Sequence, residues 1–153
     1  MKKVLVLLAF AFLGSQAIAQ SNEAEMLISM FKVEKKALLM DFLELSEEEG
    51  AAFWPIYEAF DMERGHIAKK RIDLISKYAE GYGAMTAEQV DALANESFAI
   101  RASLEGLHKT YYKKFKKAVG AIRAAQFVQF ERFVDNAIDS RLNDSLPLIG
   151  ELD

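Results

Sequence analysis

Both histidines of this 153-residue chain belong to a Glu-x-x-His unit. The two units consist of Glu63, His66, Glu105 and His108. On a helix, residues at i and i+3 share one face, and bundles that hold two metal ions combine this unit with glutamates from two further helices. Glu34 and Glu131 are available for that second role. The sequence therefore contains the residue types of a carboxylate–imidazole metal site.

The helical positions of these residues weaken the metal interpretation. At about 100° per residue, Glu63 falls at the edge of the apolar face of its helix, and His66 lies beyond that edge. His108 lies near the apolar face of its own helix, whereas Glu105 turns away from it. We favour ordinary helix residues and expect no cofactor, and we keep a metal-binding or metal-sensing protein as the alternative function.

Two arginines, Arg64 and Arg71, fall near the middle of the apolar stripe of their helix, where an unpaired charge is costly. Three interpretations are open. The side chains snorkel out of a partly covered face, they pair with acids from another helix, or they line a mixed apolar and cationic surface that contacts partners.

Large apolar side chains gather in the run Phe53-Trp54-Pro55-Ile56-Tyr57, and phenylalanines repeat every third residue from Phe127 to Phe133. Such clusters predict core, with a hydrophobic groove for a partner as the alternative. The candidate partner-binding residues are Phe53, Trp54, Tyr57, Arg64 and Arg71.

Catalytic signatures are missing from the chain. It contains no Gly-x-Ser-x-Gly motif, phosphate-binding loop, His-Glu-x-x-His motif or dinucleotide fingerprint. We therefore expect that the protein is not an enzyme.

Apolar residues recur at spacings of three and four, which predicts helices. A first helix is expected over roughly Asn22–Leu43. A second is expected from Glu47 to about Glu80, with Ser46 and Glu49 forming a capping box at its start and Pro55 kinking it.

Gly81-Tyr82-Gly83 breaks the second helix, and Thr86 with Gln89 repeats the capping box. A third helix runs from there to about Lys117. A fourth, over roughly 121–142, is either continuous with the third or bent near Gly120. The expected fold is all-α with four helices, in which a long antiparallel hairpin is flanked by the N- and C-terminal helices.

The first 19 residues have the pattern of an export signal. Lys2 and Lys3 precede an apolar run over residues 4–13, and Ala17-Ile18-Ala19 is a small-x-small cleavage site. The run is too short to span a bilayer as a helix. We expect a signal peptide over 1–19, a single helical domain over 20–143, a tail over 144–153 and a periplasmic location.

The composition limits the partners. Loss of Lys2 and Lys3 with the signal changes the formal net charge from −4 to −6, which argues against nucleic-acid binding. The chain has no cysteine, so disulfides and a lipidated cysteine are excluded, and we expect no stable membrane anchor.

Two short motifs carry a resemblance to a known family. Leu45-Ser46-Glu47-Glu48-Glu49 and Met85-Thr86-Ala87-Glu88-Gln89 resemble the Leu-Thr-x-x-Gln motifs of the Spy/CpxP-like periplasmic proteins, with Ser, Glu and Met as departures. The segments 49–57 and 127–148 resemble a largely uncharacterised branch near that superfamily.

The resemblance implies a curved helical hairpin that dimerises. It also implies a protein that holds unfolded or stress-exposed envelope proteins or reports stress to a membrane sensor, and members of the superfamily are linked with metal resistance. We therefore expect a non-enzymatic interaction protein of chaperone or stress-adaptor type, with protein partners and a homodimeric state.

Overall fold

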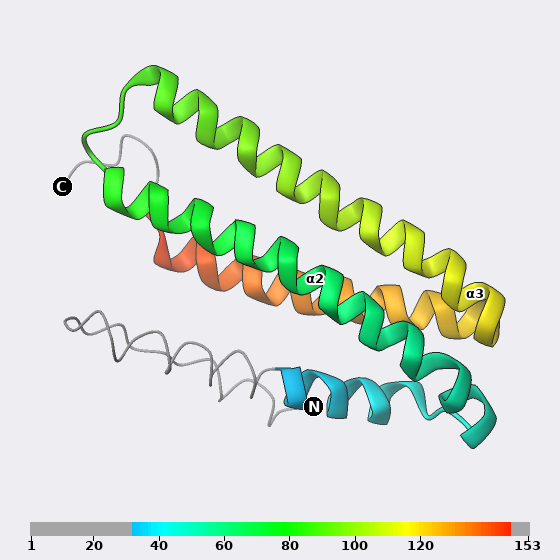
Figure 1. Cartoon of the computed structure of the whole chain (residues 1–153). Coiled ribbons are helices and arrows are strands. Elements are labelled where there is room, and N and C mark those ends of the chain that lie inside the picture. Colours follow the sequence, from blue (N-terminus) through cyan, green and yellow to red (C-terminus); the bar gives the residue numbers. More distant parts are fainter. Residues whose placement is uncertain (1–31, 148–153) are drawn as a thin grey trace. The chain divides into compact units, whose positions relative to one another are not determined.

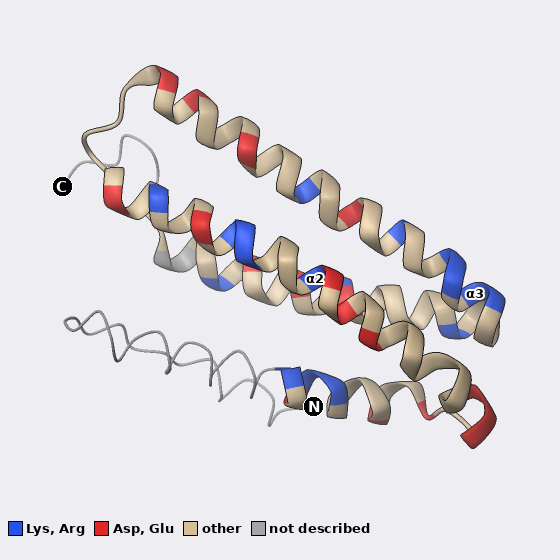
Figure 2. Cartoon of the chain, viewed as in Figure 1, with Lys and Arg blue, Asp and Glu red and all other residues tan. Residues whose placement is uncertain are grey.

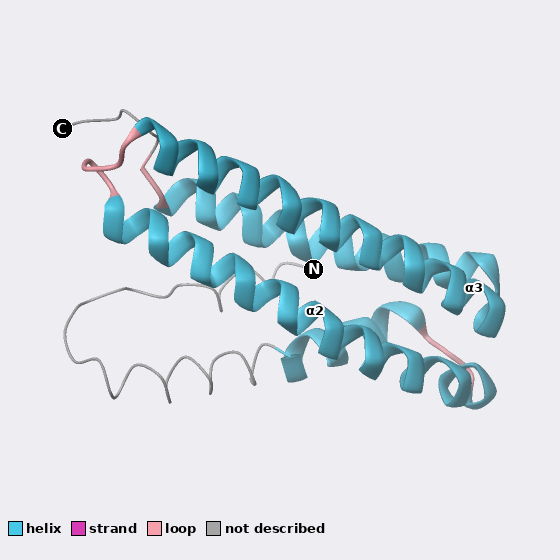
Figure 3. Cartoon of the chain, turned by 45° about the horizontal axis from the view of Figure 1, so that its top comes forward, coloured by secondary structure: helices cyan, strands magenta, loops and turns pink. Residues whose placement is uncertain are grey.

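The computed structural model describes residues 32–147, and the regular structure in that range is helical (Figures 1 and 3). The expected signal peptide and the start of the first helix lie outside the described residues. The chain divides into two units, residues 1–38 and 39–153. In the first unit the described residues 32–38 are helical, and this short helix continues to residue 43 in the second.

The helix α2 spans Glu47–Gly81 and continues through Pro55. Its capping box is formed as the sequence predicts, because the Ser46 hydroxyl accepts from the Glu49 amide at 3.2 Å and the Glu49 carboxylate accepts from the Ser46 amide at 2.9 Å. Three acids in the first turn, at positions 47–49, complement the positive end of the helix dipole.

The helix α3 spans Ala87–Ser145 and begins with the second predicted capping box, between Thr86 and Gln89. The turn between α2 and α3 contains Gly83 at φ 79°, a left-handed conformation that favours glycine. The two glycines of the Gly-Tyr-Gly segment therefore mark the end of α2 as expected.

Gly120 divides α3 into two arms, because its φ of 86° and ψ of 169° are not helical. We call residues 87–119 the first arm and residues 121–145 the second arm. The bend near Gly120, one of the two expected alternatives, is confirmed. The expected fourth helix is the second arm of α3, and the structure does not show it as a separate element. A single residue accomplishes the reversal, and no loop is inserted.

The two arms run antiparallel to each other. Phe115 and Phe127 have ring centroids 4.3 Å apart on either side of the bend, and Glu105 reaches Arg132 further along. The second arm runs parallel to α2, since contacts from α2 advance along it in the same direction (Figure 1). The second unit is therefore built on α2 and the two arms of α3, with α2 antiparallel to the first arm.

An aromatic core fills the space between these three segments. Phe53 stacks on Phe115 at 4.4 Å, and the ring of Phe127 meets that of Phe60 edge-on at 4.9 Å. Leu39 and Leu43 of the short helix are fully buried in the same cluster. Burial of these large rings is the main stabilising contribution in the core. Truncation of one such ring to alanine typically costs several kcal/mol.

The second arm also holds the end of the short helix. The guanidinium of Arg123 donates to the carbonyl oxygens of Leu43 at 2.6 Å and Glu44 at 3.3 Å. It also pairs with the Glu49 carboxylate at 3.2 Å. One arginine thus satisfies carbonyls at a helix end and ties it to the start of α2.

Candidate functional site

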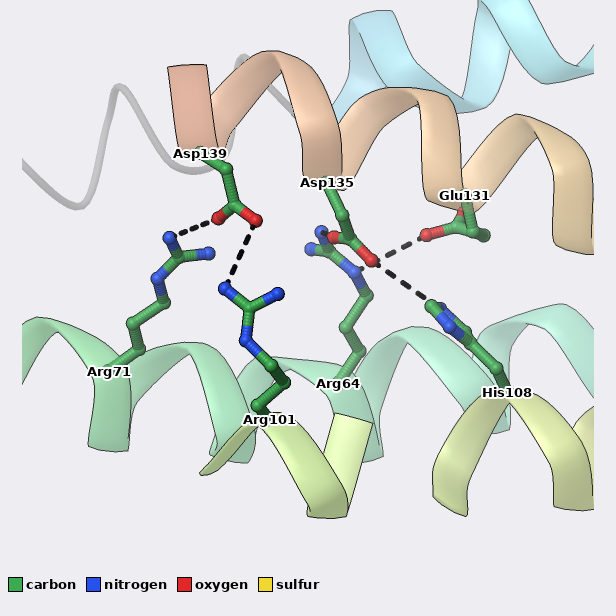
Figure 4. A network of polar contacts seen from close by, with 7 residues as sticks. All are labelled: Arg64, Arg71, Arg101, His108, Glu131, Asp135 and Asp139. Carbon is green, nitrogen blue, oxygen red and sulfur yellow. Dashed lines mark hydrogen bonds and ion pairs between the residues drawn. The ribbon is translucent and has the colours of Figure 1, made fainter. Parts of the chain in front are cut away.

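Three acids on one face of the second arm form the polar centre of the unit (Figure 4). Glu131, Asp135 and Asp139 are spaced at i, i+4 and i+8, so they line up along the helix. They face basic side chains from α2 and from the first arm. We call this set the charge network, and its members are Arg64, Arg71, Arg101, His108, Glu131, Asp135 and Asp139.

Arg64 is the central cation of the charge network. Its Nε lies 3.3 Å from Glu131, and its Nη2 donates to Asp135 at 2.6 Å. Burial opposes the charge, but the two carboxylates outweigh it and raise the pKa of Arg64, so the guanidinium remains protonated. The Glu131 side chain is fully buried, so it depends on this cation.

Arg71 repeats the arrangement two turns later. It donates to Asp139, whose second oxygen lies 3.5 Å from the more exposed Arg101. Both arginines singled out in the sequence thus pair with acids from another helix, the second of the three interpretations. Their charges stabilise the packing of α2 on the second arm.

His108 completes the network from the first arm. Its ring is buried and stacks on Phe60 at 5.8 Å, and its Nε2 lies 3.6 Å from Asp135, beyond hydrogen-bond distance. Burial lowers the pKa of His108, against the opposing effect of Asp135 and Glu105. A neutral imidazole beside a carboxylate is therefore built into the interior.

The aromatic candidates divide between core and surface. Phe53 and Tyr57 are buried in the core cluster, and burial raises the pKa of Tyr57 above its usual range. Trp54 is half-buried and meets Phe53 edge-on at 5.0 Å. Of these three residues, Trp54 is the one with a substantial part of its side chain at the surface.

The structure separates the two Glu-x-x-His units. Glu63 accepts from the Tyr111 hydroxyl at 2.6 Å, while His66 is exposed. Burial and the Glu63 carboxylate raise the pKa of Tyr111 to about 12. In the part of the chain that the structure describes, no three His, Asp or Glu side chains are grouped so that they could hold a metal ion.

The residues of the second Glu-x-x-His motif, Glu105 and His108, have other partners. Glu105 forms an ion pair with Arg132 at 2.6 Å, and His108 faces the charge network. Glu63 and His66 instead line a shallow hollow of about 360 Å³ between α2 and the first arm, together with Gly106.

A second and larger hollow lies between the two arms of α3. We call it the inter-arm groove; it has a volume of about 510 Å³ and is lined by Tyr112, Ala125, Val128, Gln129, Arg132, Phe133 and Asn136. The side chain of Phe133 is 68% exposed on its edge. The phenylalanine repeat thus divides, because Phe127 is fully buried while Phe133 faces solvent.

The outward face of the second arm is poor in charge. Ile122 lies three turns before Phe133 on the same side of the helix and is 76% exposed. Solvent-facing stripes of helices are usually rich in charged residues, and exposed apolar patches mark interaction sites. The uncharged residues Ile122, Ala125, Gln129 and Phe133 at helical spacing were the signal for this face. Sequence reasoning considered only Phe133 among them, as core or as part of a hydrophobic groove.

None of the helices in the described range is long and apolar enough to cross a membrane. The described residues form an all-α protein built on the long antiparallel pair of α2 and α3. Searches of family models, of curated proteins and of solved structures find no match to the chain. The resemblance to Spy/CpxP-like proteins stays a prediction from sequence.

Proposed function

We propose that the chain is an exported, non-enzymatic protein that binds other proteins, acting as a chaperone for unfolded envelope proteins or as an envelope-stress adaptor. The observation that carries the proposal is the inter-arm groove, whose apolar lining opens to solvent beside the largely exposed Phe133. Apolar surface of this kind is stabilised when a partner covers it.

The buried polar groups favour binding over catalysis. Arg64, Asp135 and Glu131 engage one another inside the protein, and none of them lines either hollow. A reactive group needs access to substrate, whereas ion pairs between helices stabilise an arrangement that presents a surface. The motifs Leu45–Glu49 and Met85–Gln89 form true capping boxes, which is consistent with the helix starts of the proposed family.

The finer points of the proposal concern fold and assembly. We propose that the short helix extends over residues 22–43, so that the domain has four helical segments, the first and the last of which flank a central antiparallel pair. We also propose that the mature protein is a homodimer. We also propose a periplasmic location after cleavage behind Ala19. Cell fractionation tests the location, and N-terminal sequencing tests the cleavage site. Light scattering on the purified mature chain tests the homodimer.

The chaperone form of the proposal is tested by aggregation. The mature chain should suppress light scattering from an unfolding client, such as reduced α-lactalbumin, at a near-stoichiometric ratio. Phe133→Ser should weaken suppression at least threefold, while Met62→Ser, which changes an exposed residue of α2, should not. Absence of suppression at tenfold excess would remove the chaperone form.

The adaptor form is tested by crosslinking. A dedicated partner should co-purify from crosslinked periplasm with the wild type and be lost with Phe133→Ser. A broad set of unfolded proteins would favour the chaperone form instead. Recovery of no protein with either version would contradict the proposal that the chain binds proteins at this surface.

A further inference from the structure

We propose that the inter-arm groove binds an acidic amphipathic helix of a partner protein, with apolar side chains against Phe133 and carboxylates toward Lys109 and Lys116. This inference rests on the proposed function, since it names the kind of segment that a protein-binding surface at this place would accept.

The apolar half of the inference comes from the groove lining. Ala125, Val128 and the exposed Phe133 line it from the second arm, and the half-buried Tyr112 lines it from the first arm. Only Arg132 among the lining residues is charged. A segment with two or three apolar side chains on one face would cover this surface and exclude water from it.

The acidic half comes from the rim of the groove. Lys109 and Lys116 are exposed and lie at i−3 and i+4 from Tyr112, so helical geometry places both on the same side of the first arm as that residue. Within residues 32–147, neither lysine takes part in an ion pair. More generally, basic residues gather on α3 next to its bend (Figure 2).

The groove offers no acid that would neutralise these lysines. No lining residue is a carboxylate, and the nearest acid on the first arm, Glu105, is held by Arg132 at 2.6 Å. The site is therefore locally cationic on a chain whose formal net charge is −4. Complementarity therefore favours an acidic partner segment at this site.

The dimensions favour a helix as the bound segment. Lining residues on the second arm extend from Ala125 to Asn136, which is about three turns, or roughly 16 Å. Lys109 and Lys116 are seven residues apart, which is about two turns. Carboxylates at i and i+7 of a helix would match this separation, and apolar residues on the adjoining face of the same helix would turn into the groove.

Binding is measured by fluorescence anisotropy with labelled synthetic peptides and the mature chain. The first peptide is an amphipathic helix with leucines on one face and glutamates at its flanks, the second has lysines in place of the glutamates, and the third has the first composition scrambled. We expect the first peptide to bind at least tenfold more tightly than the other two. Its affinity should fall as the salt concentration is raised. Equal affinity of the first two peptides would overturn the acidic requirement, and equal affinity of the first and third would overturn the helical one.

Matched variants locate the binding. Lys116→Glu should weaken the binding of the first peptide at least fivefold. Lys70→Glu, the same charge change at an exposed position of α2, should leave the affinity for that peptide unchanged. Phe133→Ser should abolish binding and Met62→Ser should not. Equal effects within either pair would contradict the proposed place, and circular dichroism checks that each variant keeps its helices.

Two controls distinguish failure of the acidic-helix inference from failure of the proposed protein-binding function. Suppression of client aggregation without any peptide binding would preserve the proposed function and overturn the acidic-helix inference. Light scattering without peptide tests the other occupant: a dimer that Phe133→Ser dissociates would assign the groove to a second copy and would equally overturn the inference.

Discussion

The imidazole of His108 lies 3.6 Å from the carboxylate of Asp135, and the opposite oxygen of that carboxylate accepts a hydrogen bond from Arg64. One acid of the second arm is thus shared between α2 and the first arm. Because all three segments meet at this carboxylate, changes of charge at His108 act on the packing of the whole unit.

Acidification should destabilise the protein through His108. Burial lowers the pKa of His108 in the folded state, although Asp135 and Glu105 oppose the effect and Arg64 and Arg132 add to it. The unfolded chain therefore takes up a proton near pH 6.5 while the folded chain does not. The stability contributed by the neutral ring is complete above that pH and declines as the pH falls toward the folded pKa.

Urea unfolding at pH values between 8 and 5 measures this effect. The free energy of unfolding of the wild type should fall more steeply with acidification than that of His108→Gln. His66→Gln, which changes an exposed histidine of α2, should follow the wild type. Parallel curves for wild type and His108→Gln would show that His108 does not contribute to the pH dependence.

Removal of the central cation should be costly. Arg64→Met leaves the fully buried Glu131 and the mostly buried Asp135 without their guanidinium. Breaking a buried pair at one partner typically costs about 3–5 kcal/mol. Arg101→Met is the control, because the Arg101 side chain is 78% exposed and its pair with Asp139 should contribute less than about 1 kcal/mol. Equal costs in chemical denaturation would contradict the assignment of Arg64 as the central cation.

Two glycines of α3 should respond to alanine in opposite ways. Gly120 has a positive φ of 86° with extended ψ, a region open essentially to glycine alone, so Gly120→Ala should destabilise by about 1–3 kcal/mol. Gly106 lies in the first arm with open space around an added Cβ, so Gly106→Ala should stabilise by roughly 0.5–1 kcal/mol. Thermal unfolding of both variants measures these changes in stability. Stabilisation by Gly120→Ala would contradict the bend at this residue.

The contact between Arg123 and the short helix should be specific for arginine. Its two Nη groups donate to carbonyls of Leu43 and Glu44, a forked geometry that a lysine ammonium does not reproduce. Arg123→Lys should therefore cost about 1–2 kcal/mol. Arg132→Lys, at an exposed pair with Glu105, should cost less than about 1 kcal/mol. A similar cost for the two would indicate that the carbonyl contacts add little to stability.

The sequence predicted the helix starts well, because capping is local. Ser46 and Thr86 lie at the expected positions, and each N-cap requires only residues three apart to interact. The all-α class and the antiparallel relation of α2 to the first arm followed from periodicity and the Gly81–Gly83 break. The direction of the second arm did not follow, since it depends on the positive φ of one glycine.

The site was harder to anticipate than the fold. The pairing of Arg64 and Arg71 was among the expected alternatives, but their partners are about 70 residues away along the chain. The regular spacing of Glu131, Asp135 and Asp139 was a usable signal, because acids at i, i+4 and i+8 share a face. Whether that face is inward depends on packing, as the burial of Glu131 shows.

The reversal at Gly120 also limits how this chain can change length. A loop absorbs an inserted or deleted residue by bulging, whereas here one residue separates two packed helical arms. One extra residue in the second arm would rotate everything after it by about 100°. The carboxylates of Glu131 and Asp135 would then leave their arginine, and the side chain of Phe133 would leave the groove edge. An insertion before Glu131 would therefore turn the inner face of the second arm away from the residues that it contacts.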